Sequence, residues 1–252
     1  YACDDFWCTF RSIGGAAGNV RGAYAHCDRP WGGVQLADCG TVRDFSSAVA
    51  HSSVPLIGHE TGQYQAYPDY SEIAKYTGVL EPLNLKIFRE RLVKAGLADR
   101  ADDFHRASGA LQVLNYREDI EMALRTPGFG GFQLLDLQDF PGQGTALVGI
   151  LNVFMESKGF ISPEKWREFC APTVLLARYP ASTLTEGDAF GADIQIAHYG
   201  KEDVLTGVLA WRLVDSSGKT PSKGELPVSA RVGEVAAVGT VAATLPVVGK
   251  AE

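Results

Sequence analysis

The chain has 252 residues, of which 46% are hydrophobic and 21% are charged. These fractions are close to those of soluble globular proteins, so they exclude disorder along the whole chain. The formal net charge is −7 and no cluster of Lys and Arg forms a basic patch, which excludes a nucleic-acid partner. No apolar run reaches the roughly 18 residues that a membrane helix needs, so we expect no membrane partner either.

Four of the five cysteines fall in the first 39 residues; the five are Cys3, Cys8, Cys27, Cys39 and Cys170. They form no C-x-x-C pair, so their spacing argues against a zinc site. Free thiols, or one or two disulfides in an exported protein, are both open. The chain starts at Tyr1 without a signal-peptide pattern and stops directly after a strand-like segment, so we interpret it as an internal piece of a longer protein.

Residues 1–50 are rich in turns and contain one extended segment, VRGAYAHC, at 20–27. Alternation in this segment places Tyr24 and His26 on the same face of a predicted strand.

The run SVPLIG at 53–58 predicts a second strand. It is apolar throughout, as in a parallel sheet that is covered on both faces. The run stops abruptly on His59 and Glu60, so an imidazole and a carboxylate follow directly after the apolar segment.

Two helices are predicted next. From Asn84 the apolar residues Leu85, Phe88 and Leu92 recur every three or four positions, which is the helical period. A second helix is expected from about 102 to 124, with apolar positions at Phe104, Leu111, Leu114, Ile120 and Leu124.

A third strand is predicted from about Phe132, and it ends at the carboxylates Asp136 and Asp139 before a Gly/Pro-rich loop. A further helix is expected after it, with apolar positions at Leu147, Ile150, Leu151 and Phe154. This alternation of strands and helices is typical of a parallel sheet with crossovers. Both strands carry polar residues at their carboxyl ends, where a (β/α)8 barrel has its active site.

After about Trp166 the pattern changes to short β-rich runs separated by Gly, Pro, Asp and Ser, which predicts an antiparallel, immunoglobulin-like β-sandwich. The predicted class is therefore α/β plus all-β. We expect residues 1–170 to belong to a (β/α)8 TIM barrel, of which the resemblance described below implies the C-terminal part, and residues 171–252 to form a β-sandwich that is itself truncated.

Glu60 is the first candidate for chemistry. A carboxylate at the carboxyl end of a barrel strand, with His59 beside it and Gln63, Tyr64 and Tyr67 just beyond, has the parts of a carbohydrate site. A retaining glycosidase needs two such carboxyl groups roughly 5 to 5.5 Å apart. A helix N-cap or a structural ion pair is the alternative role for Glu60.

Asp136 and Asp139 are the second candidates. Alternation places Asp136 on the same face as Phe132 and Leu134, so Asp136 would enter the mouth of the barrel. For Asp139 a role as the cap of the next loop is equally open.

Other chemistries lack their motifs. The segment PGFGGF at 127–132 precedes its strand, whereas a dinucleotide-binding loop follows one. There is no G-x-S-x-G, the motif of a nucleophile elbow. The histidines form neither H-E-x-x-H nor an i, i+4 pair, the patterns that support metal ligation. We expect no metal and no other cofactor.

The segments VPLIGHETGQY at 54–64 and GFGGFQLLDLQDFPG at 128–142 together resemble the seventh and eighth barrel strands of glycoside hydrolase family 2. This group contains β-galactosidases, β-glucuronidases and β-mannosidases. The family nucleophile ends a P-[LIV]-[LIV]-x-x-E strand, which corresponds here to the segment from Pro55 to Glu60. The later G-G-F…D-x-x-D pattern corresponds to Gly130, Gly131, Phe132, Asp136 and Asp139.

The resemblance implies that residues 1–170 hold about strands 6 to 8 of the barrel, with Tyr24 and His26 on strand six facing the pocket. It implies exo-acting, retaining hydrolysis of a β-linked glycan, as in a β-galactosidase, with Glu60 as the nucleophile. The remaining substrate-binding residues would be His59, Gln63, Tyr64, Asp136 and Asp139.

The family acid/base residue belongs to an Asn-Glu pair on strand four, which would precede this chain, so the chain alone is expected to be inactive. The sequence departs from the family at QLLDL (133–137), where many members have an aromatic residue, and this puts the choice of sugar in doubt. A non-catalytic carbohydrate-binding or degenerate glycosidase-like protein is the alternative. The expected partner is an oligosaccharide or glycoside, and a role in polysaccharide degradation favours the periplasm or the exterior over the cytoplasm.

Overall fold

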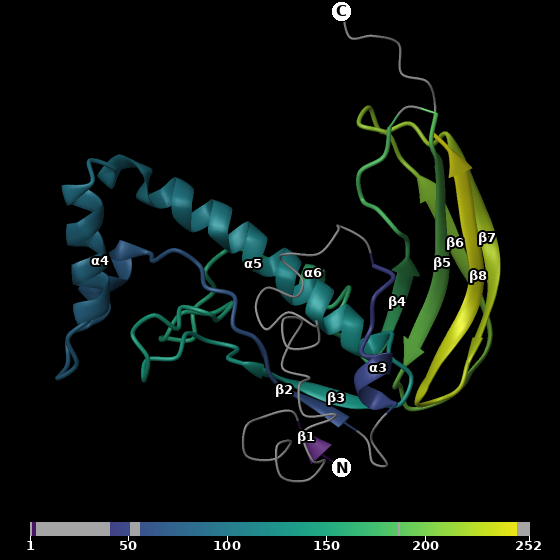
Figure 1. Ribbon diagram of the computed structural model, residues 1–252, viewed down its shortest axis with the longest axis horizontal. Coiled ribbons are helices and arrows are strands. Elements are labelled where there is room, and N and C mark those ends of the chain that lie inside the picture. The colour runs from purple at the N-terminus through teal and green to yellow at the C-terminus, as the bar shows by residue number, and fades with distance from the viewer. Residues whose placement is uncertain (1, 4–40, 51–55, 186, 246–252) are drawn as a thin grey trace, which may run out of the picture.

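The computed structural model of the protein describes residues 2–3, 41–50, 56–185 and 187–245 (Figure 1). Its first part contains β1 (Ala2–Cys3), α3 (Ser46–Val49), β2 (Leu56–Gly62), the 3-10 helix η1 (Tyr70–Lys75), α4 (Leu83–Lys94), the 3-10 helix η2 (Ala98–Arg100), α5 (Ala101–Leu124), β3 (Phe129–Leu135) and α6 (Pro163–Trp166). Its last part contains β4 (Thr173–Arg178), β5 (Ala189–His198), β6 (Val204–Leu213), β7 (Ser222–Ala230) and β8 (Glu234–Thr244). The strand expected at 20–27, with Tyr24 and His26, lies outside the described residues.

Strands β1, β2 and β3 form one parallel sheet in that order. Strand β2 pairs with β3 from Leu56 opposite Phe129 to Gly62 opposite Leu135, with two register shifts between. The connection from β2 to β3 contains η1, α4, η2 and α5, and α5 packs against both strands. In Figure 1 the two strands lie below the long diagonal α5.

The prediction of a (β/α)8 barrel is wrong for the part of the chain that the structure describes. The parallel sheet has three strands, one of them two residues long, and it does not close. A barrel also needs a helix after each strand, and the described chain contains no such helix between β3 and α6.

Residues 136–162, where a helix was expected at 147–154, form turns and isolated bridges instead. The reason is a close approach of two backbones: a Cβ on Gly149 would lie 2.2 Å from the carbonyl carbon of Gln138, so only glycine fits here. The amide of Leu151 then donates to Leu137 O at 3.0 Å, and the amide of Asp139 donates to Leu151 O at 3.0 Å. These long-range bonds replace the i to i−4 bonds of a helix.

The two helices between β2 and β3 are confirmed as elements, and α4 buries Leu85 and Leu92 as its period predicted. The predicted apolar face of α5 is confirmed at Ile120, which is fully buried, but is wrong at two other positions. Leu111 and Leu114 are 55% and 63% exposed. The buried residues of α5 are polar as well as apolar: Gln112, Asn115, Asp119 and Glu121 lie beside Tyr116, Ile120, Met122 and Ala123.

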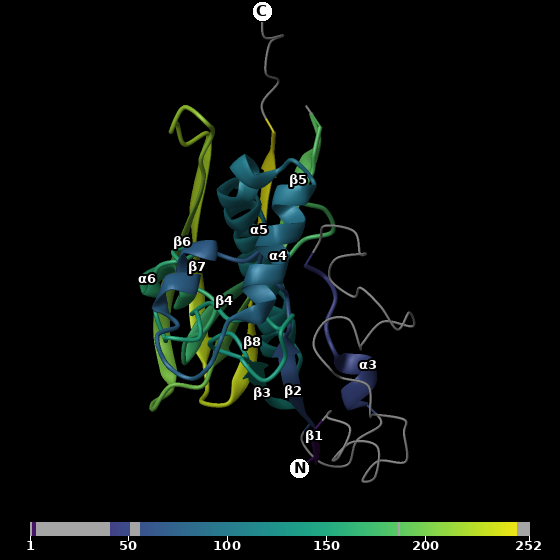
Figure 2. The same cartoon turned by 90° about the vertical axis from the view of Figure 1, so that its left-hand side faces the viewer.

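The last five strands form two small antiparallel sheets, β4-β5-β8 and β6-β7. Apolar side chains of β5, β7 and β8 meet in one cluster, which contains Ile196, Val228, Ala230 and Ala236. The prediction that the chain after about residue 170 forms antiparallel strands is therefore confirmed for the described residues. The immunoglobulin-like class is wrong for the described residues, because five strands in a 3+2 arrangement fall short of the seven such a domain needs. Figure 2 views these sheets from the side of α4.

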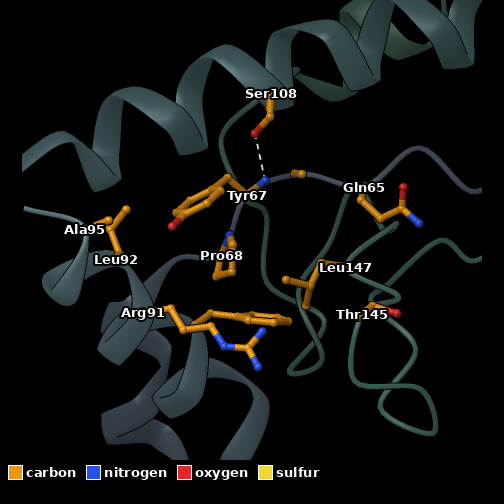
Figure 3. Close-up of a pocket in the computed structure, with 11 residues that line it drawn as sticks. Gln65, Tyr67, Pro68, Arg91, Leu92, Ala95, Ser108, Thr145 and Leu147 are labelled. Atoms are coloured by element: carbon orange, nitrogen blue, oxygen red, sulfur yellow. Dashed lines mark hydrogen bonds between the residues drawn. The ribbon is translucent and has the colours of Figure 1, made fainter. Parts of the chain in front are cut away.

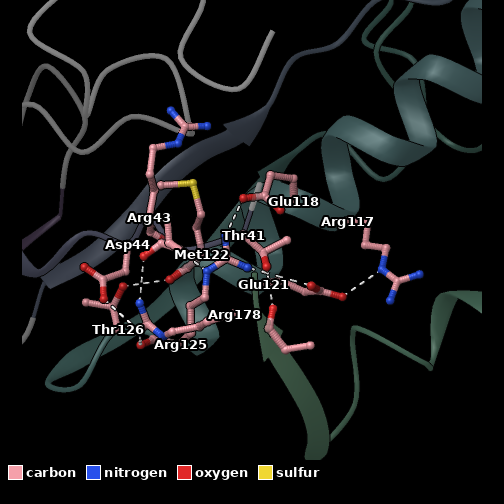
Figure 4. A network of polar contacts seen from close by, with 12 residues as sticks. Thr41, Arg43, Asp44, Arg117, Glu118, Glu121, Met122, Arg125, Thr126 and Arg178 are labelled. Atoms are coloured by element: carbon pink, nitrogen blue, oxygen red, sulfur yellow. Dashed lines mark hydrogen bonds and ion pairs between the residues drawn. The ribbon is translucent and has the colours of Figure 1, made fainter. Parts of the chain in front are cut away.

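A buried polar network joins α5 to β4 (Figure 4). Arg125, just after α5, has no exposed surface and forms ion pairs with Glu118 and, at 3.8 Å, with Glu121. Arg178 of β4 donates to the carbonyl of Arg125 at 2.6 Å and to Asp44 Oδ2 at 2.8 Å. Because removing one partner of a buried pair leaves an uncompensated charge, this network fixes the end of α5 against β4.

None of the described helices has both the length and the hydropathy that crossing a membrane requires.

Candidate functional site

The carboxyl ends of β2 and β3 lie side by side, and they bring two of the predicted site residues onto neighbouring strands. Glu60 is part of β2, two residues before the strand ends at Gly62. Asp136 directly follows Leu135, the last residue of β3, which is opposite Gly62. The backbones of His59 and Glu60 belong to β2, while their side chains lie outside the described part of the structure.

The chain turns sharply after β2, at Gly62 and Gln63. Both residues have positive φ, 103° and 63°, which is unusual for a non-glycine residue such as Gln63. A Cβ on Gly62 would lie 2.2 Å from the ring of Tyr116. The amide of Gly62 also donates to Asp119 Oδ2 at 3.2 Å. The turn that follows Glu60 is therefore fixed by α5.

Tyr64, predicted to contact a sugar, lies in the core at 5% exposure. Its ring meets that of Tyr116 edge to face, with centroids 5.6 Å apart, and its hydroxyl donates to Asp119 Oδ2 at 3.2 Å. Gln112 donates from Nε2 to the carbonyl of Tyr64 and, at 3.0 Å, to that of Val148. The structure thus gives Tyr64 a packing position and leaves Gln63, half-buried, at the turn itself.

Asp139, four residues after β3, is buried at 2% exposure. Its Oδ1 accepts from Lys158 Nζ at 2.6 Å and from the amide of Gly149 at 2.9 Å. Burial raises the pKa of Asp139, while Lys158 and the Gly149 amide act in the opposite direction. Asp139 is thus held in an internal ion pair, whereas Asp136, three residues earlier, is half-buried.

Glu72 of η1, which the sequence did not single out, lies near this pair. It is only 6% exposed. Burial, and then the negative charges of Asp139 and Asp69, raise the pKa of Glu72 to about 7, while Lys158 and a hydrogen bond with Asn152 act in the opposite direction. A carboxyl group with such a pKa is partly protonated at neutral pH, a state that often marks functional sites.

Glu72 and Asp139 both line a cleft of about 240 Å³. We call it the η1–α4 cleft, and its other walls include Tyr76, Leu80, Glu81, Leu83, Asn84, Phe140 and Gln143. The cleft lies between η1, the start of α4 and the loop after β3. It is therefore built from the segments that follow the carboxyl ends of β2 and β3.

A second, larger groove of about 540 Å³ lies between α4, α5 and the segment after β2 (Figure 3). Its walls are mainly apolar and include Tyr67, Pro68, Leu92, Ala95 and Leu147. Ser108 of α5 accepts a hydrogen bond from the amide of Tyr67 at 2.7 Å, which fixes one wall. Arg91 runs along the groove and brings a guanidinium group to it (Figure 3).

The missed residues Gln112, Tyr116 and Asp119 had a signal in the sequence, since they recur at spacings of three and four along α5. Residues at this spacing lie on one face of a helix, whether they are polar or apolar. For Glu72 the signal was weaker. Asp69 caps η1 by accepting from the amide of Ser71 at 2.8 Å, and Asp with an acid three residues later resembles a capping box, which predicts a helix start rather than a buried acid.

Among the described residues, no group of three or more His, Cys, Asp or Glu side chains is arranged to hold a metal ion.

Comparison with protein families matches residues 188–252 to a domain of unknown function, DUF8488. This segment includes strands β5 to β8, and it is about a quarter of the chain. No curated protein matches the chain. The match concerns the antiparallel sheets and does not extend to β2, β3 or the clefts beside them.

Proposed function

We propose that this chain carries the nucleophile of a retaining β-glycosidase and that Glu60 is this nucleophile. The observation that supports the proposal best is the pairing of β2 with β3. Glu60 lies near the carboxyl end of β2, and Asp136 lies at the adjacent carboxyl end of β3. Ligand sites of parallel α/β sheets lie outside the carboxyl ends of the strands, and this proposal does not require the strands to close into a barrel.

In the proposed reaction the Glu60 carboxylate attacks the anomeric carbon of a β-linked sugar. The bond from that carbon to the leaving oxygen breaks, and a carboxylic acid donates its proton to this oxygen. Water, deprotonated by the same group, then attacks the anomeric carbon and releases Glu60. The resemblance to family 2 puts this acid/base group outside the chain, and we assign it to no described residue.

Three other residues have supporting roles in the proposal. His59 precedes the nucleophile, Asp136 lies on the neighbouring strand end, and Gln63 stands at the turn that follows. Each offers a polar side chain suited to a sugar hydroxyl. Because Asp119 and Tyr116 of α5 fix this turn, the position of Gln63 relative to β2 is set before any substrate binds, and such preorganisation lowers the entropy cost of binding.

The test uses 2,4-dinitrophenyl 2-deoxy-2-fluoro-β-glycosides of galactose, glucose, glucuronic acid and mannose. Dinitrophenolate leaves without a proton, so the first step needs no acid residue and can be followed in this chain. The fluorine slows hydrolysis of the ester that forms. We expect stoichiometric release of dinitrophenolate with one of the sugars, and mass spectrometry of a digest should locate the sugar on the peptide that contains Glu60.

The matched control pair is Glu60→Gln and Glu90→Gln, since Glu90 is exposed on α4. The first variant should lose the label and the second should keep it. A label on another carboxylate would refute the assignment of Glu60. Saturable sugar binding without any label, equal in the wild type and in Glu60→Gln, would favour the non-catalytic carbohydrate-binding protein.

A further inference from the structure

The η1–α4 cleft is a feature that the proposed nucleophile does not use. We propose that this cleft binds one ring of an uncharged, hydroxyl-bearing molecule, such as a pyranose, between the carboxyl groups of Glu72 and Asp139. The inference stands on the cleft itself and holds whether or not Glu60 is a nucleophile. It assigns a binding site to a part of the chain that no comparison covers.

The size of the cleft limits the ligand to a small one. Its volume is about 240 Å³, below the roughly 300 Å³ at which sites for drug-sized molecules begin. A single six-membered ring with its substituents fits such a space, whereas an oligosaccharide would extend out of it. The opening lies beside the first turn of α4, where Leu83 is 56% exposed.

The charges around the cleft favour an uncharged ligand. The negative charge of Asp139 is already compensated by Lys158 at 2.6 Å, with both side chains almost fully buried. Glu72 is buried beside this pair, so a second full negative charge there is unfavourable. An anionic ligand would be repelled by Glu72, Asp139 and the nearby Glu81.

The hydrogen-bonding groups of the cleft suit hydroxyls. An ionised carboxylate only accepts hydrogen bonds, whereas a protonated carboxyl also donates one. Asp139 therefore offers an acceptor, and protonated Glu72 offers a donor a short distance away. A hydroxyl both donates and accepts, so adjacent hydroxyls of one ring satisfy both carboxyl groups.

Aromatic walls complete the site. Tyr76 and Phe140 line the cleft, and Tyr76 is held by an edge-to-face contact with Phe154 at 5.1 Å between centroids. Phe140 is 41% exposed, so part of its ring is open to a ligand. The C–H face of a sugar ring packs on such rings, while its hydroxyls point to the polar side.

Binding should weaken as pH rises, because the donor is lost when Glu72 ionises. The groups that bear on its ionisation come from η1, from the residues directly before and after it, and from the segment after β3; they are Asp69, Lys75, Tyr76, Asp139 and Lys158. With a pKa of about 7 for Glu72, affinity should fall about tenfold between pH 6 and pH 8 if only the protonated form binds.

The experiment measures binding of methyl β-glycosides of galactose, glucose and mannose, and of myo-inositol, by calorimetry at pH 6, 7 and 8. It uses the full chain with Glu60→Gln, so that turnover does not contribute. We expect saturable binding of at least one probe that weakens about tenfold from pH 6 to pH 8. Adding Glu72→Gln should keep the binding and reduce the change with pH to less than about twofold, because an amide still donates.

Two tryptophan substitutions locate the ligand. Leu83→Trp places a large ring at the mouth of the cleft, and Ile87→Trp places it one turn further along α4, outside the cleft. Both positions are exposed, so neither change should affect folding. We expect the first variant to lose binding and the second to retain it.

Three results would overturn the proposal. They are the absence of saturable binding by every probe up to its solubility limit, equal binding by the two tryptophan variants, and tighter binding of the dication 1,5-diaminopentane than of any sugar. The glycosidase proposal would survive each of these, since its own test is the label on Glu60.

Discussion

Replacing Glu72 by Gln should change how the stability of the protein depends on pH. Glu72 is buried beside Asp139, and its pKa rises from 4.5 to about 7 in the folded state. Between these two values the folded chain binds more protons at this position than the unfolded chain does. The contribution of protonated Glu72 to stability is therefore fully present below pH 4.5, falls as pH rises above this value, and is lost once pH has risen through 7. Glutamine has no proton to lose, so the variant lacks this loss.

The magnitude follows from the displacement of the pKa. A rise from 4.5 to about 7 corresponds to about 3–4 kcal/mol at high pH, at roughly 1.4 kcal/mol per pH unit. Part of this cost is already present at pH 5, so about 2–3 kcal/mol is lost between pH 5 and pH 8. This is large compared with the stability of a typical domain, about 5–15 kcal/mol.

The assay is urea unfolding followed by tryptophan fluorescence at pH 5, 6, 7 and 8. Trp166 packs against Tyr116 and Phe169, so its emission reports on the region that contains the cleft. Glu81→Gln is the control, because Glu81 lines the same cleft but has a side chain 58% exposed. We expect the wild type to lose about 2–3 kcal/mol relative to Glu72→Gln from pH 5 to pH 8, and the control to follow the wild type. Equal pH dependence in the wild type and in Glu72→Gln would refute the reasoning.

Two further substitutions test the support of the site. Gly62→Ala should destabilise the protein by about 2–4 kcal/mol, because φ is 103° and the new Cβ would meet Tyr116 at 2.2 Å. Gly78→Ala, with nothing within 4 Å of its Cβ, should stay within about 0.5 kcal/mol, and equal effects in urea unfolding would contradict the assigned strain. Arg125→Met should cost about 3–5 kcal/mol, since it leaves Glu118, whose side chain is only 15% exposed, without its partner. Arg106→Met, with a side chain 70% exposed, should cost less than about 1 kcal/mol, and an Arg125→Met variant of wild-type stability would show that the network does not hold α5.

The elements of this chain could be predicted where the hydrophobic period was strong. The helix α4 and the strands after residue 170 follow their patterns closely, because their burial is decided by neighbours near in sequence. The β2 strand extends through His59 and Glu60 to Gly62, further than its apolar run. A polar residue in a strand costs nothing in backbone hydrogen bonding, so hydropathy alone underestimates the length of a strand that ends in a site.

The prediction failed where one close contact decided the conformation. The segment around Ile150 has helical spacing of apolar residues, yet Gly149 lies directly against the backbone of Gln138, and the loop forms long-range bonds instead. Gly109 lies inside α5, where glycine is a poor helix former, yet a Cβ there would lie 2.2 Å from the ring of Phe160. Neither contact is visible in a single sequence, because each joins residues distant along the chain or on different elements.

The polar face of α5 explains why the candidate site was only half visible. Hydropathy pointed to Leu111 and Leu114, but the residues that contact the turn after β2 are Tyr116 and Asp119. Their hydrogen bonds satisfy backbone groups at a sharp turn, which apolar side chains cannot do. A helix that supports a site at a strand end therefore needs polar residues on its buried face. The spacing of apolar residues does not predict which face of such a helix is buried.

The stability of the protein and its affinity for a sugar both depend on the proton of Glu72, so a measurement of one tests the prediction for the other. If protonated Glu72 both lowers the cost of burial and donates to the ligand, stability must decline from about pH 4.5 and level off near pH 7, and sugar affinity must begin to decline near that same upper pH. A bound ligand favours the protonated form of Glu72. It must therefore raise the pH at which stability levels off, by about one pH unit for each tenfold excess of ligand over its Kd. A stability curve that levels off at a different pH from the one at which affinity begins to fall, or one that the ligand leaves unmoved, would show that the burial of Glu72 serves the fold alone.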